Sequence, residues 1–365
     1  MNTRSFAFFL NSALFLGFAL FSACIPEGRS SARTELVLGT LCRVELFSEG
    51  RPELYNRLFS RLYEIERMMS AKLADSEVSR INRAAGLSPV PVSPELFTVL
   101  ERAVFFAEAS GGAFDPTVGP LVALWRIGED DAKVPDREEI DIALAMVNWK
   151  ELELNRGTGE TPDETPVSGA DGPVAGTAFL RRRGMALDLG AIAKGFAADE
   201  LVKILRETGT KSAVIDLGGN IYVYGTKPRA RSFLSKSKET AKWRVGIQNP
   251  LDDRGAYAGY LEVDEGSVVT SGVYERFFTG DGKRYHHILD TLTGFPVENG
   301  LLAVTITASS SMDADALSTA VFALGREKGD ALARANGAGA VFIFADKTIR
   351  VSSANFTLTD TNFRL

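Results

Sequence analysis

Two adjacent histidines, His286 and His287, are the only histidines among the 365 residues of the chain. Because histidine is the side chain whose ordinary pKa lies near neutral pH, proton transfer by imidazole has to occur at this position. The pair is followed by Ile288, Leu289 and a polar turn that contains Gly294. This pattern predicts a short buried strand leading into the turn, with the two imidazoles on opposite faces. At most one histidine therefore enters a given site; the alternative is a surface histidine beside a half-buried one that only packs the strand end.

A loop of small residues leads into a predicted helix between Asp188 and Leu205. Its first part reads D-L-G-A-I-A-K-G-F, with glycine and alanine around Lys194. The N–H groups at a helix N-terminus bind anions, and the lysine adds a positive charge there. The loop matches neither a Walker A sequence nor a G-x-G-x-x-G fingerprint, so neither motif is assigned. Close packing of a strand against a helix is the alternative explanation for its small residues.

Asp315 and Thr319 are two oxygen donors four residues apart in a predicted helix that runs to Leu324. Residues at this spacing lie on one helical face. A carboxylate and a hydroxyl are hard donors that suit Mg²⁺, which keeps the rest of its shell for water and substrate phosphates. The alternative is helix capping, in which Asp313 is the N-cap and Asp315 complements the helix dipole.

Asp115 follows a Gly111-Gly112 pair, which ends a helix predicted at 93–110. Two glycines allow a left-handed helix end, and Pro116 holds the residue before it extended. The sequence thus predicts a carboxylate that is displayed on a rigid turn. The alternative is an aspartate that only builds the turn or caps a helix.

The elements that must position these groups belong to a globular protein of mixed architecture. Hydrophobic residues make up 45% of the chain and charged residues 24%, which is ample for a core. Apolar residues recur at helical spacing over 52–69, whereas the patterns at 35–47, 212–224 and 301–307 predict strands. We therefore expect helices and strands in one globular fold. A net charge of -6, without a long basic run, argues against nucleic acid as a partner.

The N-terminus has the features of an exported lipoprotein. An apolar stretch at 6–21 follows Arg4 and leads into small residues directly before Cys24. The stretch is too short to span a bilayer comfortably and is typical of a secretory leader. We expect residues 1–23 to be a lipoprotein signal peptide and Cys24 to carry the lipid; an ordinary signal peptide is the alternative. The mature protein would then lie on the periplasmic side of the bacterial inner membrane, anchored to it at Cys24.

The mature chain is expected to contain a tether at 24–34 and a domain at 35–365. Removing the leader removes Arg4, so the net charge becomes -6 - 1 = -7. Cys42 is then the only free thiol, and disulfides contribute nothing to the fold. Residues 155–177 are rich in Gly, Pro, Thr and acids, which predicts a long flexible hairpin insertion within the domain.

Six motifs occur in the order and spacing of the FAD:protein FMN transferase (ApbE-type) family, which the chain resembles from about Leu36 to Phe344. The motifs are G-G-A-F-D-P-T-V-G-P-L-V at 111–122, D-L-G-A-I-A-K-G-F-A-A-D at 188–199, D-L-G-G-N at 216–220, T-S-G-V-Y-E-R-F-F at 270–278, H-H-I-L-D-T-L-T-G-F-P-V at 286–297 and D-A-D-A-L-S-T-A at 313–320. The resemblance implies the ApbE-type fold, which is an α+β (mixed α/β) fold with mixed sheets flanked by helices.

The resemblance also implies an activity. Such a protein binds FAD as its substrate, uses Mg²⁺ to break the pyrophosphate, and places the FMN half on a Thr or Ser hydroxyl of a partner flavoprotein, which releases AMP. Some members instead hydrolyse FAD to FMN and AMP, so an FAD pyrophosphatase is one alternative. A lipoprotein that binds a flavin without turnover is another, because a fold alone does not establish catalysis.

Individual site residues follow from the matching motifs. His287 would accept the proton of the attacking hydroxyl, with Asp290 close by and Lys194 against the phosphates. Mg²⁺ would be bound by Asp315, Thr319 and the backbone carbonyl of Ala191, with Ala193 as a possible substitute. The residues along the flavin nucleotide would be Leu38, Lys72, Ala113, Phe114, Asp115, Asp188, Lys194, Thr270, Ser271, His287 and Ile288.

Two positions depart from the family pattern. Members commonly read Ser-Thr-Tyr where this chain has Ser70-Ala71-Lys72, so a lysine replaces the aromatic residue that covers the flavin. The family's Met-Gly-Thr is Leu38-Gly39-Thr40 here. Without the aromatic cover, we expect water to reach the phosphates and hydrolysis to compete with transfer.

Overall fold

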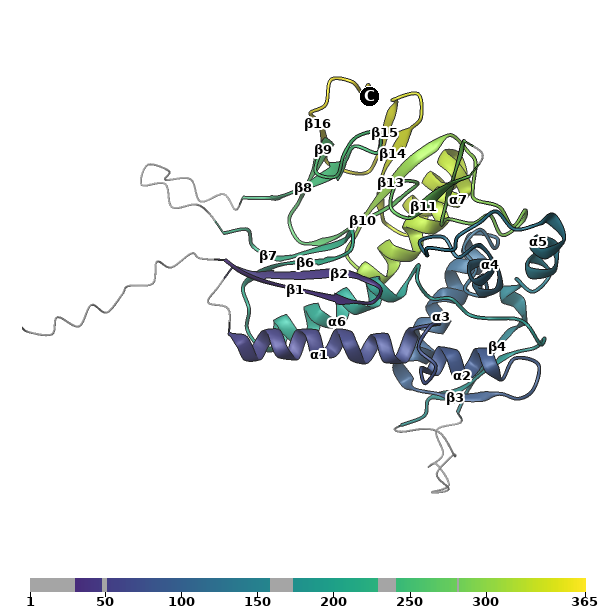
Figure 1. Cartoon of the computed structure of the whole chain (residues 1–365). Helices are drawn as coiled ribbons and strands as arrows, with labels where there is room; N and C mark the ends of the chain where they lie inside the picture. Colours follow the sequence, from purple (N-terminus) through teal and green to yellow (C-terminus); the bar gives the residue numbers. More distant parts are fainter. Residues whose placement is uncertain (1–29, 48–50, 158–172, 229–240, 281) are drawn as a thin grey trace, which may run out of the picture.

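A computed structural model describes residues 30–47, 51–157, 173–228, 241–280 and 282–365 (Figure 1). The predicted signal peptide at 1–23, Cys24 and the central part of the predicted insertion lie outside the described residues. Among the helices that are described, none combines the length and the apolar composition needed to cross a membrane.

An eight-stranded antiparallel sheet forms the centre of the molecule, with the strand order β1-β2-β6-β7-β10-β13-β14-β15. The bounds are β1 Ser31–Val37, β2 Thr40–Leu46, β6 Ser212–Leu217, β7 Asn220–Gly225, β10 Gly266–Gly272, β13 Leu301–Ala308, β14 Gly339–Phe344 and β15 Ile349–Ser352. Residues 31–34, which were expected in the tether, are therefore part of the sheet. Their polar side chains find partners on a neighbouring helix: Arg33 lies over the ring of Phe59, and Ser31 hydrogen-bonds with Tyr55.

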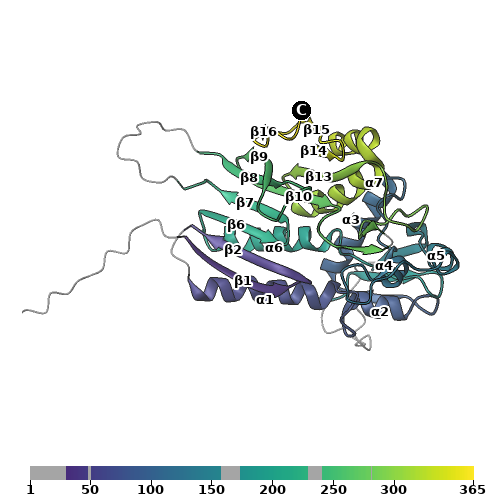
Figure 2. The same ribbon diagram turned by 45° about the horizontal axis from the view of Figure 1, so that its top comes forward.

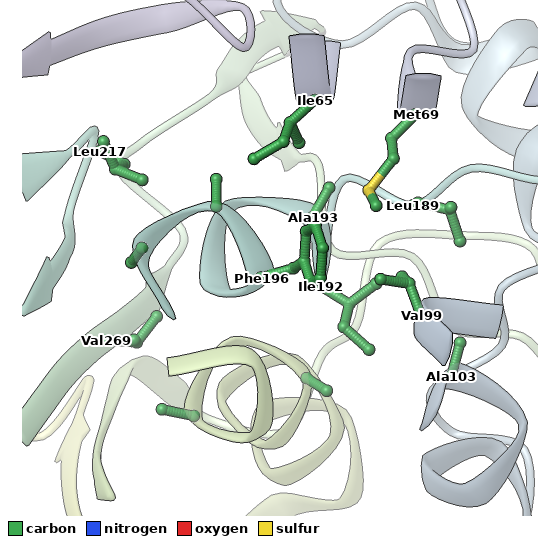
Figure 3. Packing of buried hydrophobic residues seen from close by; sticks show 14 of the residues in the cluster. Ile65, Met69, Val99, Ala103, Leu189, Ile192, Ala193, Phe196, Leu217 and Val269 are labelled. Atoms are coloured by element: carbon green, nitrogen blue, oxygen red, sulfur yellow. The ribbon is translucent and has the colours of Figure 1, made fainter. Parts of the chain in front are cut away.

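Four helices carry the main core on one face of this sheet: α1 Pro52–Met69, α3 Pro94–Ala109, α6 Ala193–Glu207 and α7 Ser311–Ala335. The spacing predicted the first correctly, and Ser93 is the expected N-cap of α3, since its side chain accepts a hydrogen bond from the N–H of Leu96. Figure 3 shows Ile65 and Met69 of α1, Val99 of α3, Phe196 of α6 and Val269 of β10 in one hydrophobic cluster. Burial of these side chains fixes α6 and α7 against each other and against the sheet.

Smaller elements complete the fold. A three-stranded sheet of β8 Trp243–Gln248, β9 Tyr257–Val263 and β16 Phe356–Leu358 packs its apolar side chains against the main sheet in a second cluster, away from the main helical core. Another sheet contains β3 Val90–Val92, β4 Leu152–Arg156 and β5 Gly176–Leu180, and β11 Phe277–Gly280 pairs with β12 Lys283–His286. The short helices are α2 Glu77–Arg83, α4 Gly119–Trp125, α5 Arg137–Leu144 and the 3₁₀ turn Trp149–Glu151. Figure 2 shows the helices and antiparallel strands of this α+β fold, which confirms the predicted class.

Candidate functional site

The predicted site residues come from turns and helix N-termini at one end of the main sheet. The β1–β2 turn meets the β6–β7 turn, because a Cβ on Gly218 would lie 2.2 Å from Oγ1 of Thr40. The segment after β10 joins them, since Arg276 donates from Nη2 to the carbonyl of Gly39 at 3.2 Å. Glycines at these turns allow three segments that are distant in sequence to approach each other closely.

Asp315, on the second turn of α7, lies against the N-terminus of α6. One carboxylate oxygen accepts the N–H of Gly195 at 2.9 Å, and the other is 3.4 Å from Nζ of Lys194. Lys194 also donates to the carbonyl of Gly190 at 2.7 Å. The Asp315 carboxylate is nearly inaccessible to water, so its charge is balanced by a lysine and a helix N-terminus. The two motifs that suggested anion binding and metal binding thus meet at one point.

Two further oxygens beside this carboxylate are free of partners in the described part of the chain. Gly195 donates to Asp315 and not to the carbonyl four residues earlier, which leaves the carbonyl of Ala191 without a hydrogen bond among the described residues. The hydroxyl of Thr319, one turn along α7 from Asp315, likewise has no partner there. Ala193 is the first residue of α6, where its carbonyl belongs to the helical hydrogen-bond ladder. A carboxylate, a hydroxyl and a carbonyl fit the oxygen preference of Mg²⁺, and Ala191 fits better than Ala193.

This set is not a cluster of acidic or histidine ligands. Among the described residues, no group of three or more His, Cys, Asp or Glu side chains is arranged to hold a metal ion. One protein carboxylate with neutral oxygens is nevertheless the usual arrangement for Mg²⁺, which relies on water and substrate phosphates for its remaining ligands.

The start of α7 is fixed by three polar side chains that were not predicted to contact it: Ser310, Asp199 and Arg102. Ser310 is the N-cap, and the carboxylate of Asp199 accepts hydrogen bonds from the N–H groups of residues 311 and 312 at 2.8 and 3.0 Å. Asp313, expected as a possible N-cap, instead forms a two-point ion pair with Arg102 of α3 at 2.7 and 2.8 Å. The D-L-G-A-I-A-K-G-F-A-A-D motif contains Asp199, but its spacing did not reveal a contact with another helix.

Gly195 of α6 packs closely against the backbone at the start of α7. A Cβ at this position would lie 2.2 Å from the carbonyl oxygen of Ser311 and 2.6 Å from Cα of Met312. We expect Gly195→Ala to force the helices apart, to lower the free energy of unfolding by about 2–3 kcal/mol, and to separate Lys194 from Asp315. Denaturant titration and AMP release from FAD would measure the two effects. Gly209→Ala, beyond the other end of α6, meets no atom within 4 Å and should cost only about 1 kcal/mol through its left-handed backbone. Unchanged stability in Gly195→Ala would contradict this packing.

The two histidines have different environments, and the strand expected to contain both ends at His286. His286 is buried edge-on against Phe322, and its ring hydrogen-bonds with the carbonyl of Val297 at 3.0 Å. The strand ends here, and the N–H of Ile288 donates a hydrogen bond to Nδ1 of the His286 ring at 3.3 Å. His286 is therefore the packing histidine, and Ile288 is buried with it.

His287 is half-buried and is held by Arg276. The carbonyl of Arg276 accepts the backbone N–H of His287 at 3.1 Å and lies 3.3 Å from its ring Nδ1. A carbonyl acceptor requires a proton on Nδ1, so the lone pair of the neutral ring is on Nε2. Burial, followed by the positive charge of Arg276, lowers the pKa of His287 to about 3, and Lys194 contributes in the same direction. The ring is thus neutral near pH 7, and its ordinary pKa of ~6.5 does not apply.

Asp290 shapes the turn after the histidines. Its Oδ1 accepts the N–H groups of Leu292 and Thr293 at 2.7 and 3.2 Å, while Trp125 donates from its indole to the carbonyl of Gly294 at 2.8 Å. One oxygen of the Asp290 carboxylate therefore forms the turn, and the catalytic role of this residue stays a prediction.

Asp115 is not displayed, contrary to the expectation from its Gly-Gly-x-x-Asp-Pro context. Its carboxylate is buried and accepts three hydrogen bonds, two from Thr117 at 2.7 and 2.6 Å and one from the N–H of Trp149 at 3.0 Å. Burial raises the pKa of Asp115 despite these bonds. The alternative of a turn-building aspartate is correct. Phe114 is also buried, next to Phe106, which leaves Ala113 as the half-exposed residue of the trio.

The remaining predicted contact residues fall into two groups. Thr270 and Ser271 use their hydroxyls inside the protein, on Thr305 and Ser318 at 2.8 Å each. Three others stay accessible: Asp188 is half-buried beside Gly190, Leu38 adopts a left-handed backbone at the β1–β2 turn, and Lys72 is exposed and forms a 2.6 Å ion pair with Glu129. Direct contacts therefore join Asp188, Lys194 and Asp315 through Gly190 and the start of α6. Arg276 joins His287 to the β1–β2 turn, where Leu38 lies.

Comparison with known proteins identifies the family of this chain. The sequence profile of the ApbE family matches residues 38–343. The chain is 45% identical to an FAD:protein FMN transferase of Treponema pallidum over 89% of this chain and 87% of the relative, and 36% identical to one of Klebsiella pneumoniae over 90% and 94%. Its structure resembles the ApbE protein of Thermotoga maritima, with a TM-score of 0.74, 30% identity and coverage of 89% and 97%. The flavin transferase ApbE of Vibrio cholerae gives a TM-score of 0.73, 28% identity and coverage of 89% and 98%. The resemblance found in the motifs is thereby confirmed, and the chain belongs to the ApbE family.

Proposed function

We propose that this protein is a Mg²⁺-dependent FAD:protein FMN transferase that cleaves the pyrophosphate of FAD, attaches FMN to a Thr or Ser of an acceptor flavoprotein and releases AMP. The observation that carries the proposal is the contact between two unconnected motifs: Lys194 at the start of α6 lies 3.4 Å from the carboxylate of Asp315 on α7. His287, from a third motif, is held by the carbonyl of Arg276, whose guanidinium reaches the β1–β2 turn. FAD:protein FMN transferase relatives that match nearly the whole chain support the same reaction.

The chain's own residues divide the work as follows. Asp315, Thr319 and the carbonyl of Ala191 would hold the metal ion, which when bound neutralises the crowded charge of the pyrophosphate. Lys194 places a point charge against the same phosphates. Nε2 of His287 accepts the proton of the acceptor hydroxyl as its oxygen bonds to the FMN phosphorus. The bond from that phosphorus to the bridging oxygen breaks, and AMP leaves with that oxygen.

We place this reaction on the periplasmic side of the inner membrane. The leader at 1–23 and the Cys24 that follows it support lipidation. Mass measurement of the purified membrane form would test the anchor: an acylated N-terminal Cys24 supports it, and a soluble mature protein that starts at another residue contradicts it.

A second candidate function, hydrolysis of FAD to FMN and AMP, is favoured by Lys72. This residue replaces the aromatic cover, and its side chain is 76% exposed while its amine pairs with Glu129. A flexible lysine drawn away by an ion pair does not exclude water as an aromatic ring over the flavin would. Water then competes with the acceptor hydroxyl for the same phosphorus.

Product analysis with FAD and Mg²⁺, with and without an acceptor flavoprotein that carries a Thr or Ser site, distinguishes the candidates. A transferase leaves a flavin mass on the acceptor that survives denaturation. AMP with free FMN, and no labelled acceptor, indicates a pyrophosphatase. Absence of AMP in both arms would leave only a flavin-binding lipoprotein and would end the enzymatic proposal.

Lys72→Tyr should shift the balance from hydrolysis toward transfer. The aromatic ring restores an apolar cover and removes the ion pair with Glu129, so we expect the ratio of labelled acceptor to free FMN to rise by about 3- to 10-fold, the effect of about 0.7–1.4 kcal/mol. Quantifying both products from one reaction gives this ratio. Lys72→Gln, which removes the charge without adding a ring, is the control; if it raises the ratio equally, the cover is not the cause.

A further inference from the structure

Arg276 contacts the site through its backbone carbonyl and through its guanidinium. It lies between β10 and β11, in the T-S-G-V-Y-E-R-F-F motif. In this motif only Thr270 and Ser271 were predicted to contact the flavin nucleotide. Its carbonyl holds both the backbone N–H and the ring of His287. Its guanidinium reaches across to the carbonyl of Gly39 in the β1–β2 turn at 3.2 Å. One residue thus connects the proposed proton acceptor to the turn that forms another wall of the site.

The guanidinium is not in direct contact with a carboxylate. Across the described residues, Arg276 has no ion pair, whereas Lys194 is paired with Asp315 at 3.4 Å. The neighbouring Glu275 lies within electrostatic reach of Arg276 and Lys194 without an ion pair to either, and desolvation raises the pKa of its carboxyl to about 7. Four of the five guanidinium N–H groups therefore form no hydrogen bond among the described residues. The fifth donates to the carbonyl of Gly39, a neutral acceptor that a charged ligand oxygen can replace.

We propose that Arg276 binds a phosphoryl oxygen of FAD through its guanidinium while its carbonyl positions the ring of His287 toward the same phosphate. This inference rests on the proposed function, because it takes the dinucleotide as the ligand of the site. Guanidinium offers two parallel N–H donors that match the oxygens of a phosphate, which an ammonium group does not. Exchange of the neutral carbonyl of Gly39 for a charged phosphate oxygen favours binding.

The arrangement couples binding to proton transfer. Because side chain and carbonyl belong to one residue, a phosphate on the guanidinium lies at a restricted distance from the ring that the carbonyl holds. The charges that face His287 are those of Arg276, His286 and Lys194. A phosphate bound to Arg276 offsets one of them, so His287 becomes a better proton acceptor when the substrate is present than when the site is empty.

The test compares Arg276→Ala, Arg276→Lys and the control Arg284→Ala by KM for FAD, kcat for AMP release and the dissociation constant of FAD from flavin fluorescence. Arg284 is an exposed arginine of β12 that lies over the ring of Phe277 and forms no hydrogen bond with His287 or Gly39 in the part of the chain that is described. We expect Arg276→Ala to raise KM and the dissociation constant about 10- to 100-fold, the effect of one charge-assisted hydrogen bond. Arg276→Lys should recover part of the loss, and Arg284→Ala should change neither constant more than about 2-fold.

Rescue by free guanidinium separates a substrate contact from a structural role. Millimolar guanidinium, far below denaturing concentrations, should lower the KM of Arg276→Ala at least about 3-fold and should not affect Arg284→Ala. An unchanged KM in Arg276→Ala, or a loss that guanidinium does not restore, overturns the inference. If wild-type protein releases no AMP, the proposed function fails on its own, and the dissociation constants of FAD still decide whether Arg276 binds the dinucleotide.

Discussion

Asp315→Asn is expected to lower AMP release from FAD by at least about 100-fold at a fixed Mg²⁺ concentration, because loss of even an indirect metal contact costs about 10- to 100-fold. Asparagine keeps the shape of the side chain and an oxygen that can still accept the N–H of Gly195, so the contact between α6 and α7 survives. What disappears is the negative charge that offsets Lys194 and that would hold the cation. The loss therefore reports on charge and metal binding.

Asp315→Ala should lose at least as much activity and also some stability, because it removes the acceptor at the start of α6 and leaves the amine of Lys194 without its carboxylate. Calorimetric titration with Mg²⁺, in the presence of a non-hydrolysable dinucleotide, measures the weakened metal affinity directly. Asp330→Asn is the matched control, since Asp330 is on the same helix and pairs only with Arg334, at 3.2 Å. Activity within about 3-fold of wild type in Asp315→Asn would contradict the assigned metal site.

His287→Ala should reduce kcat about 10²- to 10⁴-fold and change the dissociation constant of FAD far less. This is the usual contribution of a positioned general base, and the lone pair on Nε2 is the group that would be lost. Stopped-flow measurement of AMP formation, together with fluorescence titration of FAD, separates chemistry from binding. His286→Gln is the control: its ring is buried against Phe322, so the variant should lose stability and retain most of its kcat. An equal loss of FAD binding and of kcat in His287→Ala would argue against proton transfer by this ring.

The pH dependence follows from the lowered pKa of His287. In the free protein the ring is neutral above about pH 3, so the acid limb of kcat/KM that this residue controls should lie well below pH 6.5. The stability of the fold, in contrast, should fall in acid. As the pH drops below about 6.5 the unfolded chain protonates His287 and the folded chain does not, so the free energy of unfolding decreases progressively. Activity per folded molecule should thus persist to a lower pH than ordinary histidine would allow. A limb centred on pH 6.5 would show that burial does not control this residue.

Local sequence patterns were sufficient to predict much of the fold. The apolar spacing of 52–69 specified α1, and Ser93 before Pro94 marked the start of α3, because both signals are local. The motifs also indicated that Lys194, His287 and Asp315 belong together. The start of β1 at Ser31 was missed, since its polar side chains find their partners on α1 and leave no apolar alternation to read.

The directions of side chains and the contacts of the backbone could not be predicted. Asp115 in a Gly-Gly-rich turn is equally compatible with display and with burial, and only the N–H of Trp149, which comes from another segment, decides for burial. In the sequence, Asp199 is only an acidic residue within a predicted helix. Its role is seen only in the folded structure, where it accepts the N–H of Ser311 at the start of α7. Arg276 contributes to the site through a carbonyl, which every residue carries, and so no residue pattern indicates it.

The antiparallel order of the main sheet has a consequence for the folding pathway. Gly195 and Asp315 meet across 120 residues of chain, and β2 near the N-terminus pairs with β6 near residue 212. Contacts this distant in sequence close slowly, so the catalytic region is among the last parts to become organised. A nascent chain that has emerged only as far as β2 exposes an unpaired strand edge, which makes early truncated products prone to aggregation.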